Sequence, residues 1–183
     1  MNREEVLDSV KDNVENANLV KHMVATEAIM KTLARRFGED EEAWGLTGLL
    51  HDIDVELTKD DMGSHGGLGA DLARELGASE TMVHAILCHN EALGVSFETK
   101  LDKALYCADP LTGLITAAVL VRPEKKLGVV EANSVRKRFK EKSFAAGVSR
   151  EQIGKCNEIG LELDEFIDLG LQAMKGIAAQ LGL

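Results

Sequence analysis

The stretch from Gly48 to Asp54 reads Gly-Leu-Leu-His-Asp-Ile-Asp, so an apolar run ends in an imidazole beside two carboxylates. Charged side chains that directly follow aliphatic residues in the sequence are expected to be buried with them. They then need a partner, because burying an unpaired ion is costly in free energy. A divalent cation suits neighbouring His and Asp side chains, which offer one nitrogen and one oxygen ligand. The stretch therefore predicts a metal site whose other ligands lie elsewhere in the chain.

Two further residues of ligand type lie on apolar helical patterns. His22 belongs to a stretch whose apolar residues recur at intervals of three and four, as in an amphipathic helix. Asp109 ends the apolar run 104–109, and Pro110 lacks a backbone N–H, so we expect the helix to kink or restart there. With the helix expected over residues 40–51, three helices each deliver a metal-type ligand from an apolar face.

The order of these residues resembles a known pattern. His22, then His51-Asp52, then Asp109 is similar to the H…HD…D signature of the HD-domain metal-dependent phosphohydrolase superfamily, and the Leu-Leu-His-Asp-Ile context matches as well. The resemblance covers residues 19–120. It implies a helical domain in which these four side chains hold a divalent metal and activate a water molecule for phosphoester hydrolysis.

The resemblance also implies a second ion. His65 and His89 lie between the His-Asp pair and Asp109, and they resemble the two extra histidines of HD proteins that hold two metals. Asp52 would then bridge the ions. One departure is that many family members read His-Asp-Ile-Gly, whereas Asp54 stands in place of the glycine here.

Composition favours an all-α fold. The chain has 183 residues, 45% of them apolar, with only two prolines and few aromatic residues, which suits one domain with a full-sized core. We expect a single domain over residues 1–183, with an HD core at 19–120 and a helical extension at 121–183. Segments of that extension, 121–126 and 137–144, resemble stand-alone prokaryotic HD proteins without an assigned reaction.

Three cysteines, odd in number and without a C-x-x-C pair, argue against a disulfide framework and favour a reducing compartment. The charged N-terminus is followed by no signal-type apolar block, and the most apolar stretch, 111–121, is shorter than the roughly 20 residues that span a bilayer. We therefore expect a soluble, cytoplasmic protein without a membrane partner.

The charge pattern bears on the substrate. A formal charge of −10 argues against a nucleic acid polymer as partner, because such binding relies on many cationic contacts, and it favours a small phosphorylated substrate. Residues 121–142 reverse the balance, with eight Lys or Arg against three Glu. We nominate Arg122, Lys142 and Arg150 as phosphate-binding residues, because Arg offers a planar fork and Lys a point charge.

Carboxylates beside the His-Asp pair are candidates for proton transfer. Asp52 belongs to the metal site itself, while Asp54 and Glu56 lie within reach of a water molecule bound there. An equally good interpretation makes Asp54 and Glu56 solvated loop carboxylates. His84 is five residues from His89, about 140° away around a helix, so the two should not share an ion and His84 is expected to be structural or exposed. We expect Cys88 and Cys107 to behave as small buried apolar residues.

The preferred function is a divalent-metal-dependent phosphohydrolase that acts on a nucleotide or small phosphorylated metabolite. One or two ions (Mn, Fe, Zn, Ni, Co or Mg) would serve as cofactor. Two alternatives stay open: a di-iron oxygenase of the same superfamily, and a catalytically slow ligand-sensing or binding module. No serine or cysteine nucleophile is apparent, so no covalent intermediate is expected.

Overall fold

The computed structural model describes residues 1–183. Its regular structure is entirely helical, which confirms the predicted fold class, with 68% of the residues in helices and no strands. The α-helices are α1 (Arg3–Asn13), α2 (Ala17–Phe37), α3 (Glu41–Leu50), α4 (Gly67–Glu75), α5 (Glu80–His89), α6 (Lys100–Leu120), α7 (Ala132–Lys140), α8 (Arg150–Gly154), α9 (Leu163–Gly176) and α10 (Ala178–Leu181). Short 3-10 turns cover Glu91–Leu93, Leu127–Val129 and Lys155–Ile159.

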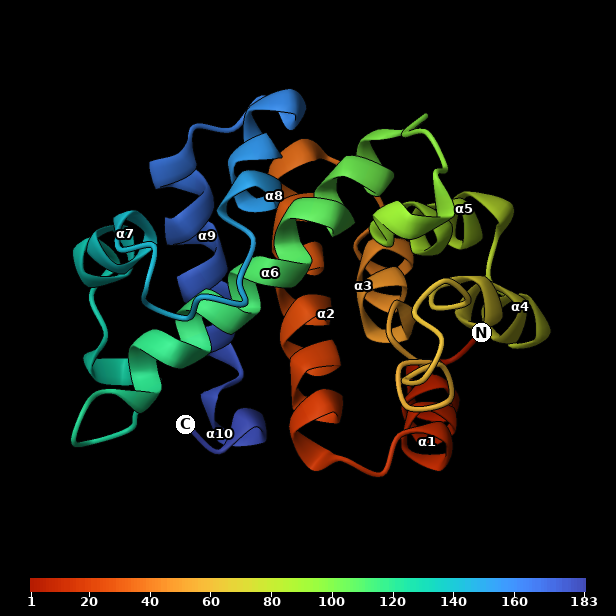
Figure 1. The fold of residues 1–183 in the computed structure, drawn as a ribbon, viewed down its shortest axis with the longest axis horizontal. Coiled ribbons are helices and arrows are strands. Elements are labelled where there is room, and N and C mark those ends of the chain that lie inside the picture. Colours follow the sequence, from red (N-terminus) through yellow and green to blue (C-terminus); the bar gives the residue numbers. More distant parts are fainter.

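The long helices α2 and α6 lie at the centre of the molecule (Figure 1). Helix α2 packs against α3, α6 and α9, while α5 packs against α4 and α6. The contact between α2 and α3 is close because Gly48 faces the α2 backbone. A Cβ atom at Gly48 would lie 3.0 Å from the backbone nitrogen of Glu27, so a larger residue would push the two helices apart.

Helix ends follow capping rules that the sequence carries. The Asp40 carboxylate accepts hydrogen bonds from two backbone N–H groups at the start of α3, and Thr99 and Asp102 form a capping box at the start of α6. Ser149 caps α8, where its side-chain oxygen accepts a hydrogen bond from the backbone N–H of Gln152. The caps of α3 and α6 fix where these two helices of the site begin.

At Pro110 we expected a kink or a restart of the helix, and the structure excludes the restart. Helix α6 continues through Pro110 and does not restart there, and both neighbouring turns remain helical. Packing of α6 in the core outweighs the missing N–H of the proline. At the C-terminal end of the chain, α9 and α10 are separated at Ile177.

A single cluster of buried apolar side chains extends from Val6 in α1 to Leu181 in α10. It joins the region 19–120 to the C-terminal helices, because α9 packs on α2 and α6. No helix combines the length and apolar character that crossing a bilayer requires.

Candidate metal centre

Six side chains of ligand type meet between α2, α3, α5 and α6. They come from different places in the chain and face one another across a small space. They are His22 in α2, His51 and Asp52 at the end of α3, His65 in the turn before α4, His89 at the end of α5, and Asp109 in α6. The structure thus brings together all six residues that we predicted as metal ligands.

The first group surrounds the Nε2 atom of His22. It lies 3.2 Å from His51 Nε2, 3.1 Å from Asp109 Oδ1 and 3.5 Å from Asp52 Oδ2. Two imidazole nitrogens and two carboxylate oxygens at such separations can contact one cation together. This is the donor set expected for a transition-metal ion.

The second group surrounds the other oxygen of Asp52. Asp52 Oδ1 lies 3.3 Å from His65 Nε2 and 3.3 Å from His89 Nε2, and these two nitrogens are 3.0 Å apart. The same oxygen is 3.4 Å from His51 Nε2. The Asp52 carboxylate therefore lies between two sets of nitrogen donors, with one oxygen on each side.

The outer ring nitrogen of every histidine faces an oxygen. His51 Nδ1 faces the carbonyl of Gly48 at 2.8 Å, and His65 Nδ1 faces Asp54 Oδ1 at 2.9 Å. His89 Nδ1 faces the carbonyl of Ile86. Carbonyl and carboxylate oxygens only accept, so these Nδ1 atoms carry the proton.

His22 is held in the same way through a hydroxyl group. The Thr112 hydroxyl donates to the carbonyl of Asp109 at 2.8 Å, so its oxygen is free to accept from His22 Nδ1 at 2.7 Å. With the Nδ1 atoms facing these outer partners, all four rings turn Nε2 inward, toward the carboxylates of Asp52 and Asp109. Nitrogen and oxygen atoms that face one another in this way need a positive charge between them, so the residues fit a divalent cation.

The electrostatics of the metal-free protein point the same way. Burial lowers the pKa of His22, but hydrogen bonds with Asp109 and Asp52 outweigh it and raise the pKa to about 10. For His65, burial is likewise outweighed by Asp52 and Asp54, and the pKa rises to about 10. The histidines hold the pKa of Asp52 well below its usual value despite burial. Without a metal, the protonated imidazoles of His22 and His65 balance the charge of the ionised carboxylates.

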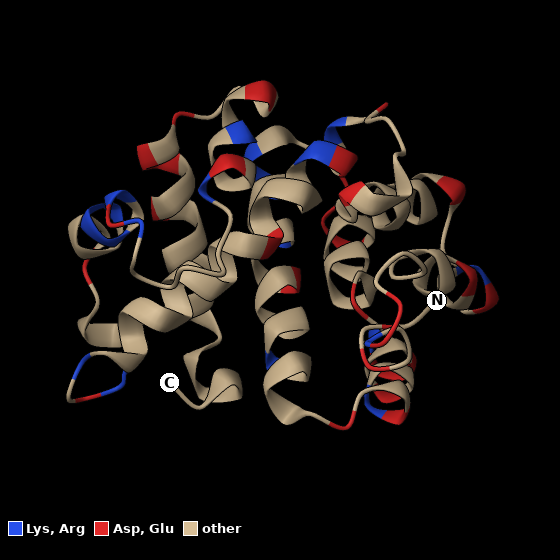
Figure 2. Ribbon diagram, viewed as in Figure 1, with Lys and Arg blue, Asp and Glu red and all other residues tan.

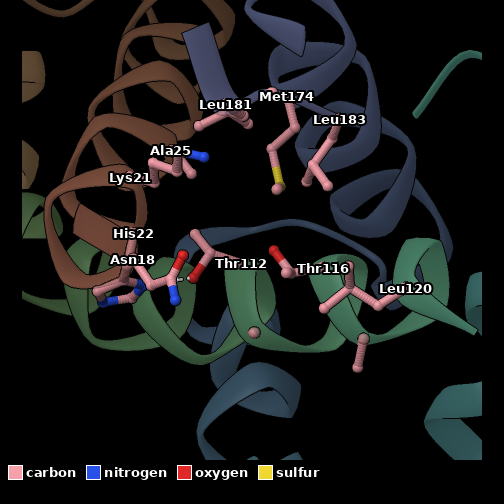
Figure 3. A pocket seen from close by; sticks show the side chains of 13 residues that line it. Asn18, Lys21, His22, Ala25, Thr112, Thr116, Leu120, Met174, Leu181 and Leu183 are labelled. Atoms are coloured by element: carbon pink, nitrogen blue, oxygen red, sulfur yellow. Dashed lines mark hydrogen bonds between the residues drawn. The ribbon is translucent and has the colours of Figure 1, made fainter. Parts of the chain in front are cut away.

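One edge of the centre is open. The side chains of Asp109 and His22 are 28% and 21% exposed, whereas that of His51 is fully buried. Beside His22 lies a cavity of about 550 Å³ between α2, α6 and the C-terminal residues (Figure 3). Asn18 and Lys21 line it from α2, and Thr112 and Thr116 from α6.

Asp54 and Glu56, our candidates for proton transfer, have other partners. Asp54 is fully buried and accepts hydrogen bonds from His65 Nδ1 and from the backbone N–H groups of Gly66 and Gly69, at 2.8 and 2.7 Å for the latter two. Glu56 accepts from the backbone N–H groups of Glu15 and Asn16 before α2. Their role in proton transfer stays a prediction, and the observed contacts are those of positioning residues.

The predicted phosphate-binding residues lie apart from the cavity. None of Arg122, Lys142 and Arg150 lines the cavity beside His22. Arg150 donates to backbone carbonyls of the segment 138–148, including Ala145 at 2.7 Å and Val148 at 2.9 Å, and so holds that segment in place. A role in phosphate binding remains a prediction for Arg122 and Lys142, while the guanidinium of Arg150 is engaged with the backbone.

Sequence reasoning missed the supporting side chain of Thr112 and assigned a different role to Asp54. Thr112 holds His22, and its position three residues after Asp109 on the same helix face was the available signal. Asp54 holds His65, and the departure from glycine at this position was noted without its structural meaning. Both act by orienting a histidine ring, as is usual around metal-binding histidines.

Comparison with known proteins agrees with this geometry. Residues 19–120 match the model of the HD domain family. The chain therefore belongs to the HD domain family, within a superfamily of metal-dependent phosphohydrolases, as its ligand pattern predicted.

Its curated relatives include several proteins named Ribonuclease Y. That of Oleidesulfovibrio alaskensis is 34% identical over 96 residues, covering 52% of this chain and 18% of that protein. That of a Sulfurovum species is 30% identical over 138 residues, covering 73% and 26%, and that of Lawsonia intracellularis is 32% identical over 115 residues, covering 63% and 21%. The chain spans no more than 26% of the length of these three relatives. No solved structure is significantly similar to it.

These names correct one prediction. From the charge of −10 we expected no nucleic acid polymer as partner, and relatives named Ribonuclease Y contradict that expectation. Net charge averages over a whole surface, whereas a polyanion meets only part of it. Figure 2 shows one gathering of Lys and Arg on α7 and on the loop that follows α6, with further Lys and Arg on α1, on α8 and at the start of α6. Acidic residues are spread over most of the helices.

Proposed function

We propose that the chain is a metal-dependent hydrolase that cleaves a phosphoester of a nucleotide, either in RNA or in a smaller nucleotide. The observation that carries this is the position of Asp52, with one carboxylate oxygen toward His22 and the other toward His65 and His89. A carboxylate shared between two histidine groups suits two ions. When bound, such ions lower the pKa of a coordinated water molecule and withdraw charge from phosphoryl oxygens.

The protein's own residues define where the substrate meets the centre. His22 and Asp109 form the exposed edge, so the phosphoester approaches there, whereas the side chain of His51 is fully buried. The rings are held by outer hydrogen bonds to Thr112, Asp54 and backbone carbonyls. They therefore need no reorientation during the reaction, which favours catalysis.

The cavity beside His22 is the natural place for the rest of the substrate. Its volume of about 550 Å³ lies in the range that small-ligand sites occupy and suits one nucleoside unit. Ala25, Leu120 and Met174 give it an apolar wall, and Lys21 offers a cation for a further phosphate (Figure 3). The Ribonuclease Y relatives support a ribonucleotide as that unit.

A direct assay tests this function. The metal-loaded protein is incubated with short single-stranded RNA and, separately, with nucleoside mono-, di- and triphosphates, in Mn²⁺, Zn²⁺, Co²⁺, Ni²⁺ or Mg²⁺. We expect hydrolysis of a phosphoester bond in one of these classes, which releases a hydroxyl group and a phosphate group, and no hydrolysis by the same preparation of Asp52→Ala. Equal turnover by the wild type and Asp52→Ala would assign the activity to a contaminant and overturn the proposal.

A further inference from the structure

A second group of ligand-type side chains lies between α5 and α6, apart from the centre described above. His84 and Cys88 are one turn apart on α5, and Asp102 is in the first turn of α6. His84 Nδ1 lies 3.0 Å from Asp102 Oδ2 and 3.5 Å from Cys88 Sγ. Cys88 and Asp102 are buried, with exposed fractions of 2% and 0%, so the three donors converge below the surface.

We propose that His84, Cys88 and Asp102 form a separate binding site for a zinc-type ion. One nitrogen, one sulfur and one oxygen donor is a set that Zn²⁺ accepts readily. With Zn–N of about 2.0 Å and Zn–S of about 2.3 Å, neighbouring donors of a tetrahedral site are about 3.5 Å apart for N and S and about 3.3 Å for N and O. The observed separations of 3.5 and 3.0 Å are close to these values.

The surroundings provide charge balance and access. The Asp102 carboxylate and a Cys88 thiolate together offset the charge of a divalent ion. Glu98 lies on the other side of the His84 ring, with Oε1 3.7 Å from His84 Nε2 and a side chain that is 73% exposed, which leaves the fourth position to solvent. A cavity of about 300 Å³, lined by His84 and Glu98 among others, opens the site to solvent.

Hydrogen bonds satisfy the three side chains when no metal is bound. His84 Nδ1 donates to Asp102, and the Cys88 thiol donates to the carbonyl of Ser96 at 3.5 Å. Asp102 also accepts from the backbone N–H groups of Glu98 and Thr99, both at 2.8 Å, which anchors the carboxylate. Metal binding replaces only the two protons that His84 and Cys88 direct at their neighbours, so the helices need not move.

The position of the site gives it a structural role. It links α5, which ends in the ligand His89, to α6, which carries the ligand Asp109. An ion at this place would fix the two helices against each other, and metal binding to the folded state adds directly to stability. The inference does not depend on the proposed phosphohydrolase activity.

Cobalt substitution gives a direct test, because the centre around Asp52 contains no sulfur. The full chain, freed of metal by a chelator, is titrated with Co²⁺ and followed by absorption spectroscopy. We expect a near-ultraviolet thiolate-to-cobalt charge-transfer band that is lost in Cys88→Ser and kept in the matched control Cys107→Ser. Cys107 is equally buried, and its Sγ donates to a backbone carbonyl of its own helix.

Metal analysis provides a second readout. Under excess Zn²⁺, Cys88→Ser should bind one ion fewer per chain than the wild type, and Cys107→Ser the same number. His84→Gln changes a partly exposed side chain and serves if Cys88→Ser does not fold; it should weaken the cobalt band and zinc affinity at least tenfold. A saturated wild-type protein without a sulfur band, or a band that survives in Cys88→Ser, would overturn the proposal.

Discussion

The carboxylate of Asp54 accepts a hydrogen bond from His65 Nδ1 at 2.9 Å and is fully buried. It also closes onto the first turn of α4, where a Cβ atom at Gly69 would lie 3.1 Å from its Cγ. The second aspartate of His-Asp-Ile-Asp thus fixes a ring of the metal centre and ties the turn before α4 to it. At the position where the family resemblance leads us to expect glycine, this chain carries an internal anchor.

Replacing Asp54 by Asn tests that anchor. The amide still accepts from His65, but its NH₂ group cannot accept from Gly66 and Gly69, which both donate to Asp54 Oδ2. We expect affinity at the His65 and His89 group to fall roughly tenfold to a hundredfold, the usual effect of losing such a partner. Isothermal titration with Mn²⁺ measures this. Asp61→Asn, in the exposed part of the same turn region, is the control and should bind metal as the wild type does.

Asp52→Ala should remove metal from both histidine groups while the fold survives. The carboxylate is the only oxygen donor that both groups share, and the apolar faces of α2, α3 and α6 still pack without it. Elemental analysis of the purified variant gives the metal content, and circular dichroism gives the helix content. Full metal occupancy in Asp52→Ala would show that the ions bind elsewhere.

Thr112→Val should lower the activity or the metal affinity of the centre, although Thr112 is not itself a proposed metal ligand. The substitution keeps the volume but removes the hydroxyl that accepts from His22 Nδ1. We expect kcat or metal affinity to fall roughly tenfold to a hundredfold. Thr116→Val, one turn further along α6, lines the same cavity without a hydrogen bond to a ligand, so it should change KM at most. Identical effects of the two variants would argue against a positioning role for Thr112.

Lys21→Met tests the cavity as a substrate site. The lysine lines the cavity next to His22, and a charge-assisted contact with phosphate is worth about 1.5–3 kcal/mol, or roughly tenfold to a hundredfold in kcat/KM. We expect KM to rise while metal content stays unchanged. Lys11→Met in α1, outside the cavity, is the control. An unchanged KM in Lys21→Met would place the substrate elsewhere.

The metal-free protein should lose stability as pH rises. The pKa values of His22 and His65 are raised from 6.5 to about 10 in the folded chain, so folding takes up protons between those values. The stabilisation they give is fully present below pH 6.5 and is lost as pH rises through about 10. Thermal unfolding after chelation should therefore show a falling Tm from pH 7 to pH 10. The metal-loaded protein should not follow this course, because bound ions have displaced the protons.

The elements and the ligand set were accessible from sequence for a physical reason. His22, His51 and Asp109 follow apolar patterns of helical period, and a ligand on such a face must point inward. Their order also matches the H…HD…D signature of the family, and that match indicated that segments far apart in the sequence contribute to one site. That these residues meet in one place follows from the packing of α2, α3 and α6.

Other features depend on three-dimensional register and could not be read in advance. Thr112 and His22 are 90 residues apart, and their contact requires that α2 and α6 cross at one particular turn. An arginine is a common phosphate ligand, which is why we nominated Arg150. Its guanidinium donates to the backbone carbonyls of Ala145 and Val148, in a loop whose conformation cannot be inferred from the periodicity of the sequence. Helix α6 passes through Pro110 because tertiary packing overrides local propensity.

The uneven exposure of the centre has a consequence for the kinetics of metal exchange. His65 and His89 have side chains only 8% and 4% exposed, behind the open edge formed by His22 and Asp109. An ion held by His65 and His89 is therefore shielded from solvent more than one held by His22 and Asp109, so we expect it to exchange more slowly. A chelator should remove metal in two phases, first from His22 and Asp109 and then, more slowly, from His65 and His89. Brief chelation would thus yield a protein that keeps one ion, at His65 and His89, and releases it slowly when the protein is diluted.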